Sequence, residues 1–496
     1  MTLKKRLGSS TAWMSLAASG NSAISFIIFI VLSRILTPSD IGLVAFALIV
    51  VEIGKIIVNA GFSQAVVQKP EWDDVYASTC FYLNIIFSIV VTLVVIFIAA
   101  PLIGHYYQAQ AEPIVKVLSI IFFIEGLKAV HEGKLKREFA FKVIAIRTIL
   151  AGLIPGAVGI YLALHNFGVW ALVWQQLLNQ IVVTVLTLIT AKWMPRFVFS
   201  FTQAKHLLAF SSPLMLSQLI SNISSKIFEL LIGIIIGPAA LGFYRVGGRA
   251  LYILQDIILK PFEHTALSAL SRVNGVSQQA RATVRMVRMS SYLTFPIFFG
   301  AAAVAPEFIT LAFGEKWAES GNIMTILAIG IAPQIVGLHV NAALTASDNS
   351  RFVMLLAIIA LIINCSLGAL TVPLGLTATA WGFSFRSYLI VGLSLFFFRY
   401  IFDISCNDML KNLAPSFIAS TIMFAVVFVS KSLFENHLPA ALNIIVLCAI
   451  GAISYMLLMI ILFKKETKNF FTESIDIAPS NVKPYIGAIQ RLINLT

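Results

Sequence analysis

Charged residues are scarce in this sequence. Asp, Glu, Lys and Arg make up 11% of its 496 residues, against about 25% in a typical soluble domain. Hydrophobic residues make up 59%. A soluble chain with so few charges could not cover that much apolar surface. The composition therefore excludes an ordinary soluble protein and indicates one that is embedded in a membrane.

Patterns that carry enzyme chemistry are also missing. The sequence has no G-x-x-x-x-G-K-[ST] motif, so it cannot hydrolyse ATP through a P-loop, and uphill transport would need an ion gradient or a separate partner. The histidines show neither metal-ligand spacing nor a nucleophile partner. We therefore expect no enzyme activity, catalytic residue, metal, cofactor or nucleic-acid partner. No disulfide is expected either, because none of the cysteines falls in a predicted external loop: Cys80, Cys365, Cys406 and Cys448.

The apolar residues come in blocks of about 20, the length of a helix that crosses roughly 30 Å of hydrocarbon. The sequence therefore predicts an all-α, multi-pass membrane protein, whose first apolar block is an uncleaved span. The fourteen predicted spans cover residues 11–36, 38–60, 75–100, 113–131, 142–164, 168–191, 207–236, 238–260, 283–305, 321–344, 351–372, 375–399, 413–431 and 440–463.

Basic residues mark one side of the predicted membrane. Loops on the N-terminal side carry Lys4, Lys134 and Arg399 among many others, whereas opposite loops such as "HNFG" and "VPLG" carry almost none. The positive-inside rule then places both termini in the cytoplasm, which agrees with an even number of spans.

The longest loop, about 261–282, leads into a basic helical face. This face consists of Arg281, Arg285 and Arg288. We interpret it as a topology signal that contacts anionic membrane lipids.

Two short echoes indicate an internal repeat. Pro38 and Gly42 match Pro238 and Gly242 at an offset of 200, each pair opening a helix after a tight outer turn. "FGVWALVW" is echoed by "LGLTATAW" at a similar offset. A unit of six spans preserves orientation, so the halves are parallel repeats related by an axis along the membrane normal. We predict an N-lobe over 1–200, a C-lobe over 201–402, and two extra spans with a cytoplasmic tail over 403–496, the lobes rocking in alternating access.

Charges inside the predicted spans are the candidate functional residues. Eight are basic and four acidic: Arg34, Lys55, Lys128, Arg147, Lys226, Arg245, Arg249 and Arg386, with Glu52, Glu125, Glu229 and Asp256. The pairs Glu52–Lys55, Glu125–Lys128 and Lys226–Glu229 are spaced to neutralise each other on one helix face. Lys128 and Arg147 lie close to the cytoplasmic edge, where a long side chain can snorkel to water.

The basic excess predicts a cationic, water-filled cavity that suits an anionic, phosphate-bearing substrate and repels organic cations. We expect six residues to bind the substrate: Arg245, Arg249, Arg386, Lys226, Lys55 and Arg34. The carboxylates Glu52, Glu229 and Asp256 are candidates for ion coupling. Cavity amides such as Gln218, Asn222, Gln334 and Asn341 are candidates for selectivity toward the substrate's headgroup.

Residues 32–68, "LSRILTPSDIGLVAFALIVVEIGKIIVNAGFSQAVVQ", and residues 231–273, "LIGIIIGPAALGFYRVGGRALYILQDIILKPFEHTALSALSRV", carry a family resemblance. They resemble the polysaccharide-transporter branch of the multidrug/oligosaccharidyl-lipid/polysaccharide (MOP) exporter superfamily, the Wzx-class flippases and the exporters of colanic-acid or teichuronic-acid type. "GKIIVNAGFSQA" is also similar to a basic stretch of lipid II flippases, which supports Lys55 as a candidate.

This resemblance implies two six-helix lobes in a V. It implies a flippase that moves undecaprenyl-diphosphate-linked oligosaccharide repeat units from the cytoplasmic to the outer leaflet of the bacterial inner membrane, with basic cavity residues holding the diphosphate. Such proteins serve the biosynthesis of exopolysaccharide or lipopolysaccharide, and a glycan polymerase and a chain-length regulator are candidate partners. Three alternatives stay open: a lipid II flippase, an ion-coupled multidrug antiporter of the same fold, and a non-transporting scaffold of a glycan polymerase complex.

Overall fold

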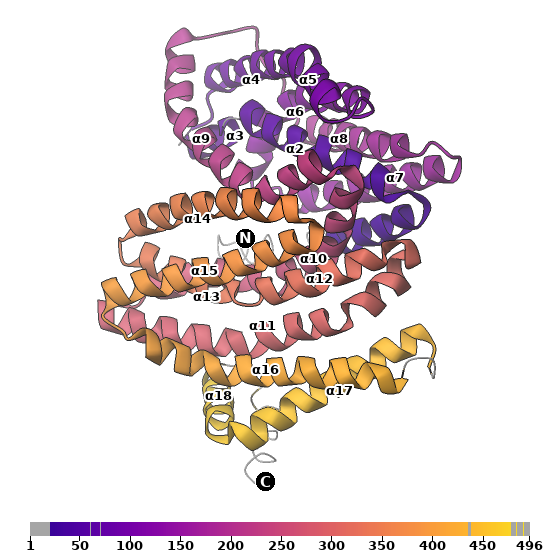
Figure 1. Ribbon diagram of the computed structural model, residues 1–496. Helices are drawn as coiled ribbons and strands as arrows, with labels where there is room; N and C mark the ends of the chain where they lie inside the picture. Colours follow the sequence, from indigo (N-terminus) through magenta and orange to yellow (C-terminus); the bar gives the residue numbers. More distant parts are fainter. Residues whose placement is uncertain are drawn as a thin grey trace. The chain divides into compact units, whose positions relative to one another are not determined.

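The computed structural model describes residues 20–59, 61–69, 71–434, 438–477, 483 and 490. Within these ranges the regular structure is helical throughout, with no strand (Figure 1). The beginning of the first predicted span and the N-terminal basic cluster with Lys4 lie outside the described residues.

Each predicted span has a helical counterpart in the structure. The first half contains a helix over Gly20–Ile35, α2 (Pro38–Asn59), α3 (Phe62–Gln68), α4 (Asp74–Val94), η1 (Val95–Ala99), α5 (Ala100–Tyr106), α6 (Ala111–Arg137), α7 (Phe141–Leu164) and α8 (Val169–Ala191). The second half contains α9 (Phe201–Leu231), η2 (Ile232–Ile236), α10 (Pro238–Leu270), α11 (Val276–Phe313), η3 (Glu315–Trp317), α12 (Ala318–Ile331), α13 (Gln334–Ala346), α14 (Ser350–Thr371), η4 (Val372–Leu374), α15 (Leu376–Phe402), α16 (Cys406–Phe434), α17 (Ala440–Leu462) and α18 (Lys464–Ile477).

Eleven helical segments of the described chain are long and apolar enough to cross a membrane. The helices α6 and α10, which carry several of the charges described below, are not among them. The chain is therefore an all-helical, multi-pass membrane protein, and the count of fourteen crossings stays a prediction.

Helix boundaries follow from local chemistry. Asp73 caps α4, because its carboxylate accepts hydrogen bonds from the backbone N–H groups of Val75 and Tyr76 at 2.9 and 3.2 Å. A hydrogen bond from Lys69 at 2.8 Å is the main reason that the pKa of Asp73 falls to about 2. Gly237, at a φ of 116°, supplies the tight turn that was predicted before Pro238, in a backbone region that favours glycine.

The chain forms two compact units. Unit 1 comprises Met1–Arg249 and Gly368–Leu376, and unit 2 comprises Ala250–Leu367 and Thr377–Thr496. Unit 1 thus includes α9 and the start of α10, which the sequence placed in the C-lobe. The lobe boundary near residue 200 follows from the internal repeat, and it stays a prediction.

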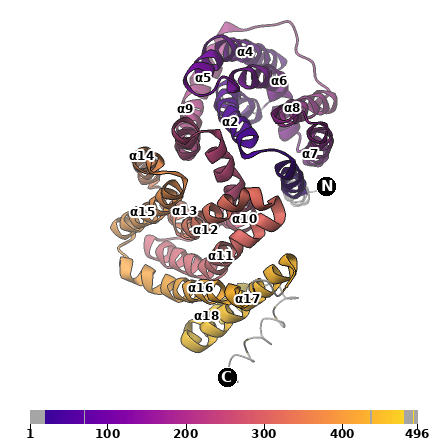
Figure 2. The ribbon, with the colours of Figure 1, turned by 45° about the vertical axis from the view of Figure 1, so that its right-hand side comes forward.

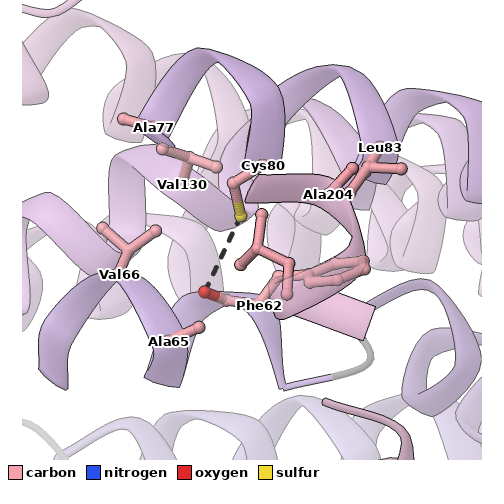
Figure 3. Close-up of a cluster of buried hydrophobic side chains, with 9 residues drawn as sticks. Phe62, Ala65, Val66, Ala77, Cys80, Leu83, Val130 and Ala204 are labelled. Carbon is pink, nitrogen blue, oxygen red and sulfur yellow. Dashed lines mark hydrogen bonds between the residues drawn. The ribbon is translucent and has the colours of Figure 1, made fainter. Parts of the chain in front are cut away.

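A buried apolar cluster joins α9 to the N-terminal helices of unit 1 (Figure 3). Phe62 of α3 and Val130 of α6 are fully buried in it, with Ala204 of α9 beside them. The Cys80 thiol on α4 is also fully buried there, 3.8 Å from the carbonyl oxygen of Phe62. Burial of these side chains explains why α9 belongs to unit 1.

The two Pro–Gly echoes contact each other within unit 1. A Cβ atom added to Gly42 would lie 1.7 Å from the carbonyl oxygen of Pro238, and one added to Gly242 would lie 2.1 Å from that of Pro38. The first turns of α2 and α10 therefore cross at a distance that only glycine permits. The contact is reciprocal, as expected for equivalent residues of two repeats.

In unit 2 the long helix α11 packs against α12, α13, α16 and α17 (Figure 2). The α18 helix also reaches α11, because Glu473 forms ion pairs with Arg285 at 3.3 Å and with Arg288. The prediction that this basic face contacts anionic lipids therefore does not describe all of its arginines. Two of its three arginines bind a carboxylate of the same chain, and Arg281 is exposed.

Candidate functional site

Glu52 and Lys55 share α2 but bind different partners. The Nζ atom of Lys55 lies 2.9 Å from Oε1 of Gln180 and 3.8 Å from Oε2 of Glu125. The carboxylate of Glu52 lies 3.7 Å from Nζ of Lys226. The predicted Glu52–Lys55 ion pair is wrong among the described residues, because each side chain finds its partner on another helix.

Glu125 is the centre of the first charged cluster, which we call the Glu125 cluster: Lys55, Asn59, Glu125, Lys128 and Gln180. Its carboxylate is 7% exposed and accepts hydrogen bonds from Asn59 at 3.2 Å and from Gln180 at 2.6 Å. The predicted pair with Lys128 is confirmed at 3.1 Å. Two lysines share one carboxylate, so the cluster carries one net positive charge.

The second cluster joins α2, α9 and α10, and we call it the Glu229 cluster: Glu52, Lys226, Glu229 and Arg245. The predicted pair of Lys226 with the buried Glu229 is confirmed at 3.3 Å, and Arg245 binds the other oxygen of Glu229 at 3.1 Å. Lys226 thus lies between two carboxylates. Such pairing is required of charges inside apolar helices, since an unpaired buried charge is strongly destabilising.

A cavity of about 410 Å³ opens beside the Glu125 cluster, and we call it the N-terminal cavity. Segments of α2, α3 and α6 line it, with Gln218 from α9. Its charged lining residues are Glu125, Glu132, Lys128 and Lys136. Lys136 pairs with Glu132 at 2.9 Å, so two acids and two bases give this cavity a formal charge of zero.

Unit 2 contains a larger cavity of about 600 Å³ between α10, α13 and α15, which we call the C-terminal cavity. Gln255 donates a hydrogen bond to Gln334 at 3.3 Å, and Gln334 donates to Ser387 at 3.4 Å. Four charged residues also line it, Asp256, Lys260, Glu263 and Arg386, again with a formal charge of zero. Asp256 pairs with Lys260 at 2.7 Å.

The remaining predicted cations have varied surroundings. Arg34 is exposed near the end of the first described helix. The guanidinium of Arg249 lies 5.5 Å from the ring centre of Phe29, and that of Arg386 lies 4.5 Å from the ring of Phe383. Of the six predicted substrate-binding residues, Lys226 and Arg245 share one cluster, Lys55 belongs to the other, and Arg386 lines the C-terminal cavity.

Snorkelling is wrong for both residues for which it was predicted. Arg147 is 7% exposed and donates a hydrogen bond to the hydroxyl of Thr187. Lys128 is drawn into the Glu125 cluster and lies 3.5 Å from Glu132. Depth along a helix did not reveal that each side chain has a polar partner within the protein.

Sequence reasoning also missed Asn59 and Gln180, which bind Glu125. Gln180 is buried within α8, in the stretch "QQLLNQ". The amide of Gln180 within a predicted span could have indicated this role, because a membrane helix tolerates such a group only where the protein provides its hydrogen-bond partners.

Comparison with known proteins places this architecture in a family. Residues 31–322 match the model of a family described as polysaccharide biosynthesis protein. The chain is 24% identical to the teichuronic acid biosynthesis protein TuaB of Bacillus subtilis (strain 168), over 92% of this chain and 96% of the relative. It is also 24% identical to the succinoglycan biosynthesis transport protein ExoT of Rhizobium meliloti (strain 1021), over 92% and 93%.

Solved structures share the fold. The lipid II flippase MurJ in an inward closed conformation superimposes with a TM-score of 0.75, at 12% identity, over 91% of this chain and 99% of that protein. An inward-facing multidrug resistance MATE family transporter of the MOP superfamily gives a TM-score of 0.51, at 14% identity, over 80% and 96%. The match over residues 31–322, more than half of the sequence, shows that the chain belongs to the polysaccharide biosynthesis protein family.

Proposed function

We propose that the protein is a flippase for undecaprenyl-diphosphate-linked oligosaccharide repeat units, which it moves from the cytoplasmic to the outer leaflet of the bacterial inner membrane. Relatives named for teichuronic acid biosynthesis and for succinoglycan transport support a role in cell-surface polysaccharide synthesis. The observation that carries the proposal is the Glu229 cluster, because its two cations, Lys226 on α9 and Arg245 on α10, share one buried carboxylate.

The cluster is suited to exchange its anionic partner. Lys226 is held by Glu52 at 3.7 Å and by Glu229 at 3.3 Å. The side chain of Glu52 is 40% exposed, whereas that of Glu229 is 3% exposed, so Glu52 is the partner that an entering diphosphate displaces more easily. Arg245 adds a guanidinium that can bind phosphate through two hydrogen bonds and keeps its charge when desolvated.

This exchange also offers a means of coupling. A carboxylate displaced by the diphosphate is free to take up a proton or a sodium ion, and its recovery of Lys226 after release would reset the site. The polyprenyl tail stays in the bilayer and only the headgroup enters the protein, so the apolar chain is not exposed to water. Glu52 and Glu229 are therefore the coupling residues we propose first, with Asp256 paired to Lys260 in unit 2.

The test compares ligands by native mass spectrometry of the detergent-purified protein. The probes are undecaprenyl diphosphate, undecaprenol, lipid II and a cationic dye, each with wild type, Arg245→Glu and the control Arg351→Glu. Arg351 is exposed at the start of α14, so its reversal changes net charge equally without touching either cluster. We expect a preference for the diphosphate that Arg245→Glu loses, because Arg245 belongs to the Glu229 cluster, and that Arg351→Glu keeps.

Other outcomes would replace the proposal. Preference for the dye would indicate a multidrug antiporter, and preference for lipid II over other diphosphate lipids would indicate a lipid II flippase. A protein that moves no lipid in liposomes but retains a glycan polymerase on a column would indicate a scaffold.

A further inference from the structure

The amides that line the C-terminal cavity are only weakly bound within the fold. Gln334 and Asn341 belong to α13, within a segment that is apolar enough to cross a membrane. An amide in such a helix is unfavourable unless its hydrogen bonds are made. Their placement therefore calls for a partner.

The partners within the protein are weak. The Gln255–Gln334 and Gln334–Ser387 hydrogen bonds are 3.3 and 3.4 Å long, beyond the usual 2.7–3.2 Å range for N–H···O bonds. Within the described part of the chain the Asn341 side chain makes no hydrogen bond, although it is exposed to the cavity. Gly337, one turn away on the same helix, also lines the cavity, and a Cβ atom added there would meet nothing closer than the Ser394 hydroxyl at 3.9 Å.

The chemistry of the lining favours one class of ligand. Amides and hydroxyls present both donors and acceptors, which is the requirement of a sugar's hydroxyl groups. The four charged lining residues cancel, so the cavity does not select strongly for an anion or a cation. Leu259, Leu338 and Ile390 provide apolar surface for the carbon faces of a pyranose ring.

We propose that the C-terminal cavity binds sugar residues of the lipid-linked oligosaccharide, with Gln255, Gln334, Asn341 and Ser387 as the selectivity-determining contacts. This inference rests on the proposed flippase function and concerns the sugar part of the substrate, which amides and hydroxyls can recognise. Its volume of about 600 Å³ lies within the range of small-molecule sites, about 300–1,000 Å³. It therefore has room for a short oligosaccharide segment.

The experiment measures how much the sugar adds to lipid binding. The first probe is the pool of polyprenyl-diphosphate-linked oligosaccharides extracted from the source organism's membranes, and the second is undecaprenyl diphosphate, which has no sugar. Native mass spectrometry gives the ratio of the two affinities for wild type, Gln334→Leu, Asn341→Leu and the double variant. Leucine suits an apolar helix, so membrane insertion is preserved, and Gln334→Asn tests rescue by a shorter amide.

We expect wild type to prefer the sugar-bearing lipids and the double variant to lose about tenfold of that preference, the effect of two hydrogen bonds of about 0.7 kcal/mol each. Binding of undecaprenyl diphosphate should not change. The matched control is Gln278→Leu, an exposed amide on α11 outside the cavity, which should keep the wild-type ratio.

Each other outcome contradicts a specific claim. Equal affinity for both lipids, or a ratio that the variants leave unchanged, would overturn the sugar site while leaving the flippase proposal intact. Loss of undecaprenyl diphosphate binding in the cavity variants would mean that the cavity holds phosphate instead. Failure of wild type to bind either lipid would contradict the proposed function itself.

Discussion

The N-terminal and C-terminal cavities occupy corresponding places in the predicted repeat but differ in chemistry. Spans 2 and 4 line the former together with α3 and Gln218 of span 7, and spans 8 and 10 line the latter together with span 12. The N-terminal cavity presents a chain of ion pairs from Lys128 to Glu132 and Lys136. The C-terminal cavity presents one ion pair within α10, between Asp256 and Lys260, and amides from α10 and α13 joined by long hydrogen bonds. The ion pairs thus link neighbouring residues throughout the lining of one cavity, whereas amide contacts between helices are what distinguish the other.

The difference in chemistry implies a difference in tolerance. Removing one partner of a buried ion pair leaves an uncompensated charge, at about 3–5 kcal/mol, whereas a lost neutral hydrogen bond is worth about 0.5–1.5 kcal/mol. Substitution of the charged residues in the N-terminal cavity should therefore destabilise unit 1 strongly, whereas substitution of the amides in the C-terminal cavity should destabilise unit 2 only slightly. If the C-terminal cavity selects the sugar, as proposed, its selectivity can change without unfolding the protein.

The largest effect is expected from Glu125→Ala. This change leaves Lys55 and Lys128 without the carboxylate that they share, and should destabilise the protein by about 3–5 kcal/mol. Thermal unfolding in detergent measures the loss. The matched change in the other cavity is Glu263→Ala, which removes an exposed carboxylate and should stay within about 0.5 kcal/mol of wild type. Equal effects of the two changes would erase the proposed contrast.

Gly42→Ala tests the contact between the first turns of α2 and α10, which joins equivalent residues of the two predicted repeats. The new methyl group would meet the carbonyl of Pro238 at 1.7 Å, so α2 and α10 must move apart. The expected loss is about 1–3 kcal/mol, as for other overpacked sites, and Gly242→Ala should give a similar loss because the contact is reciprocal. Thermal unfolding measures both variants.

The control for this pair is Gly337→Ala, because a methyl group at Gly337 would meet nothing closer than Ser394 at 3.9 Å. It should leave stability nearly unchanged or raise it slightly, since alanine favours the helix. A loss at Gly337 as large as that at Gly42 would show that helix geometry, not the crossing, sets the effect.

Much of this fold could be predicted because its signals are local. Apolar blocks of membrane-spanning length gave the helices, and the Pro–Gly echoes gave the tight turns. The pairs Glu125–Lys128 and Lys226–Glu229 followed from helical spacing alone. The pairing of Glu52 with Lys226 could not be predicted from the sequence, because it depends on which helix packs against α2.

The same limit explains the other differences. Arg147 looked able to snorkel because its depth was estimated along the helix, but its binding of Thr187 depends on the neighbouring α8. The pairing of Glu473 with Arg285 and Arg288 brings together residues from the tail and from α11. Both cavities depend on such packing, so the sequence supplied candidate polar residues and only the structure grouped them.

The smallest expected effect is a loss of stability in acid. If unit 1 depends on charge, that dependence should include the charged residue that caps α4. Asp73 caps α4 in its ionised form, and its pKa of about 2 lies below the ordinary value of 3.8. A depressed folded-state pKa means that the stabilisation is complete above pH 4 and is lost as the pH falls toward 2. We expect a loss of about 1 kcal/mol, typical of a helix cap, seen as a lower unfolding temperature at pH 2 than at pH 5. Asp73→Asn keeps an oxygen acceptor without a titrating charge, so its unfolding temperature should fall less over the same interval. If Asp73→Asn and wild type lose the same amount, the acid sensitivity arises elsewhere, and unit 1 depends on charge at its buried clusters but not at the start of α4.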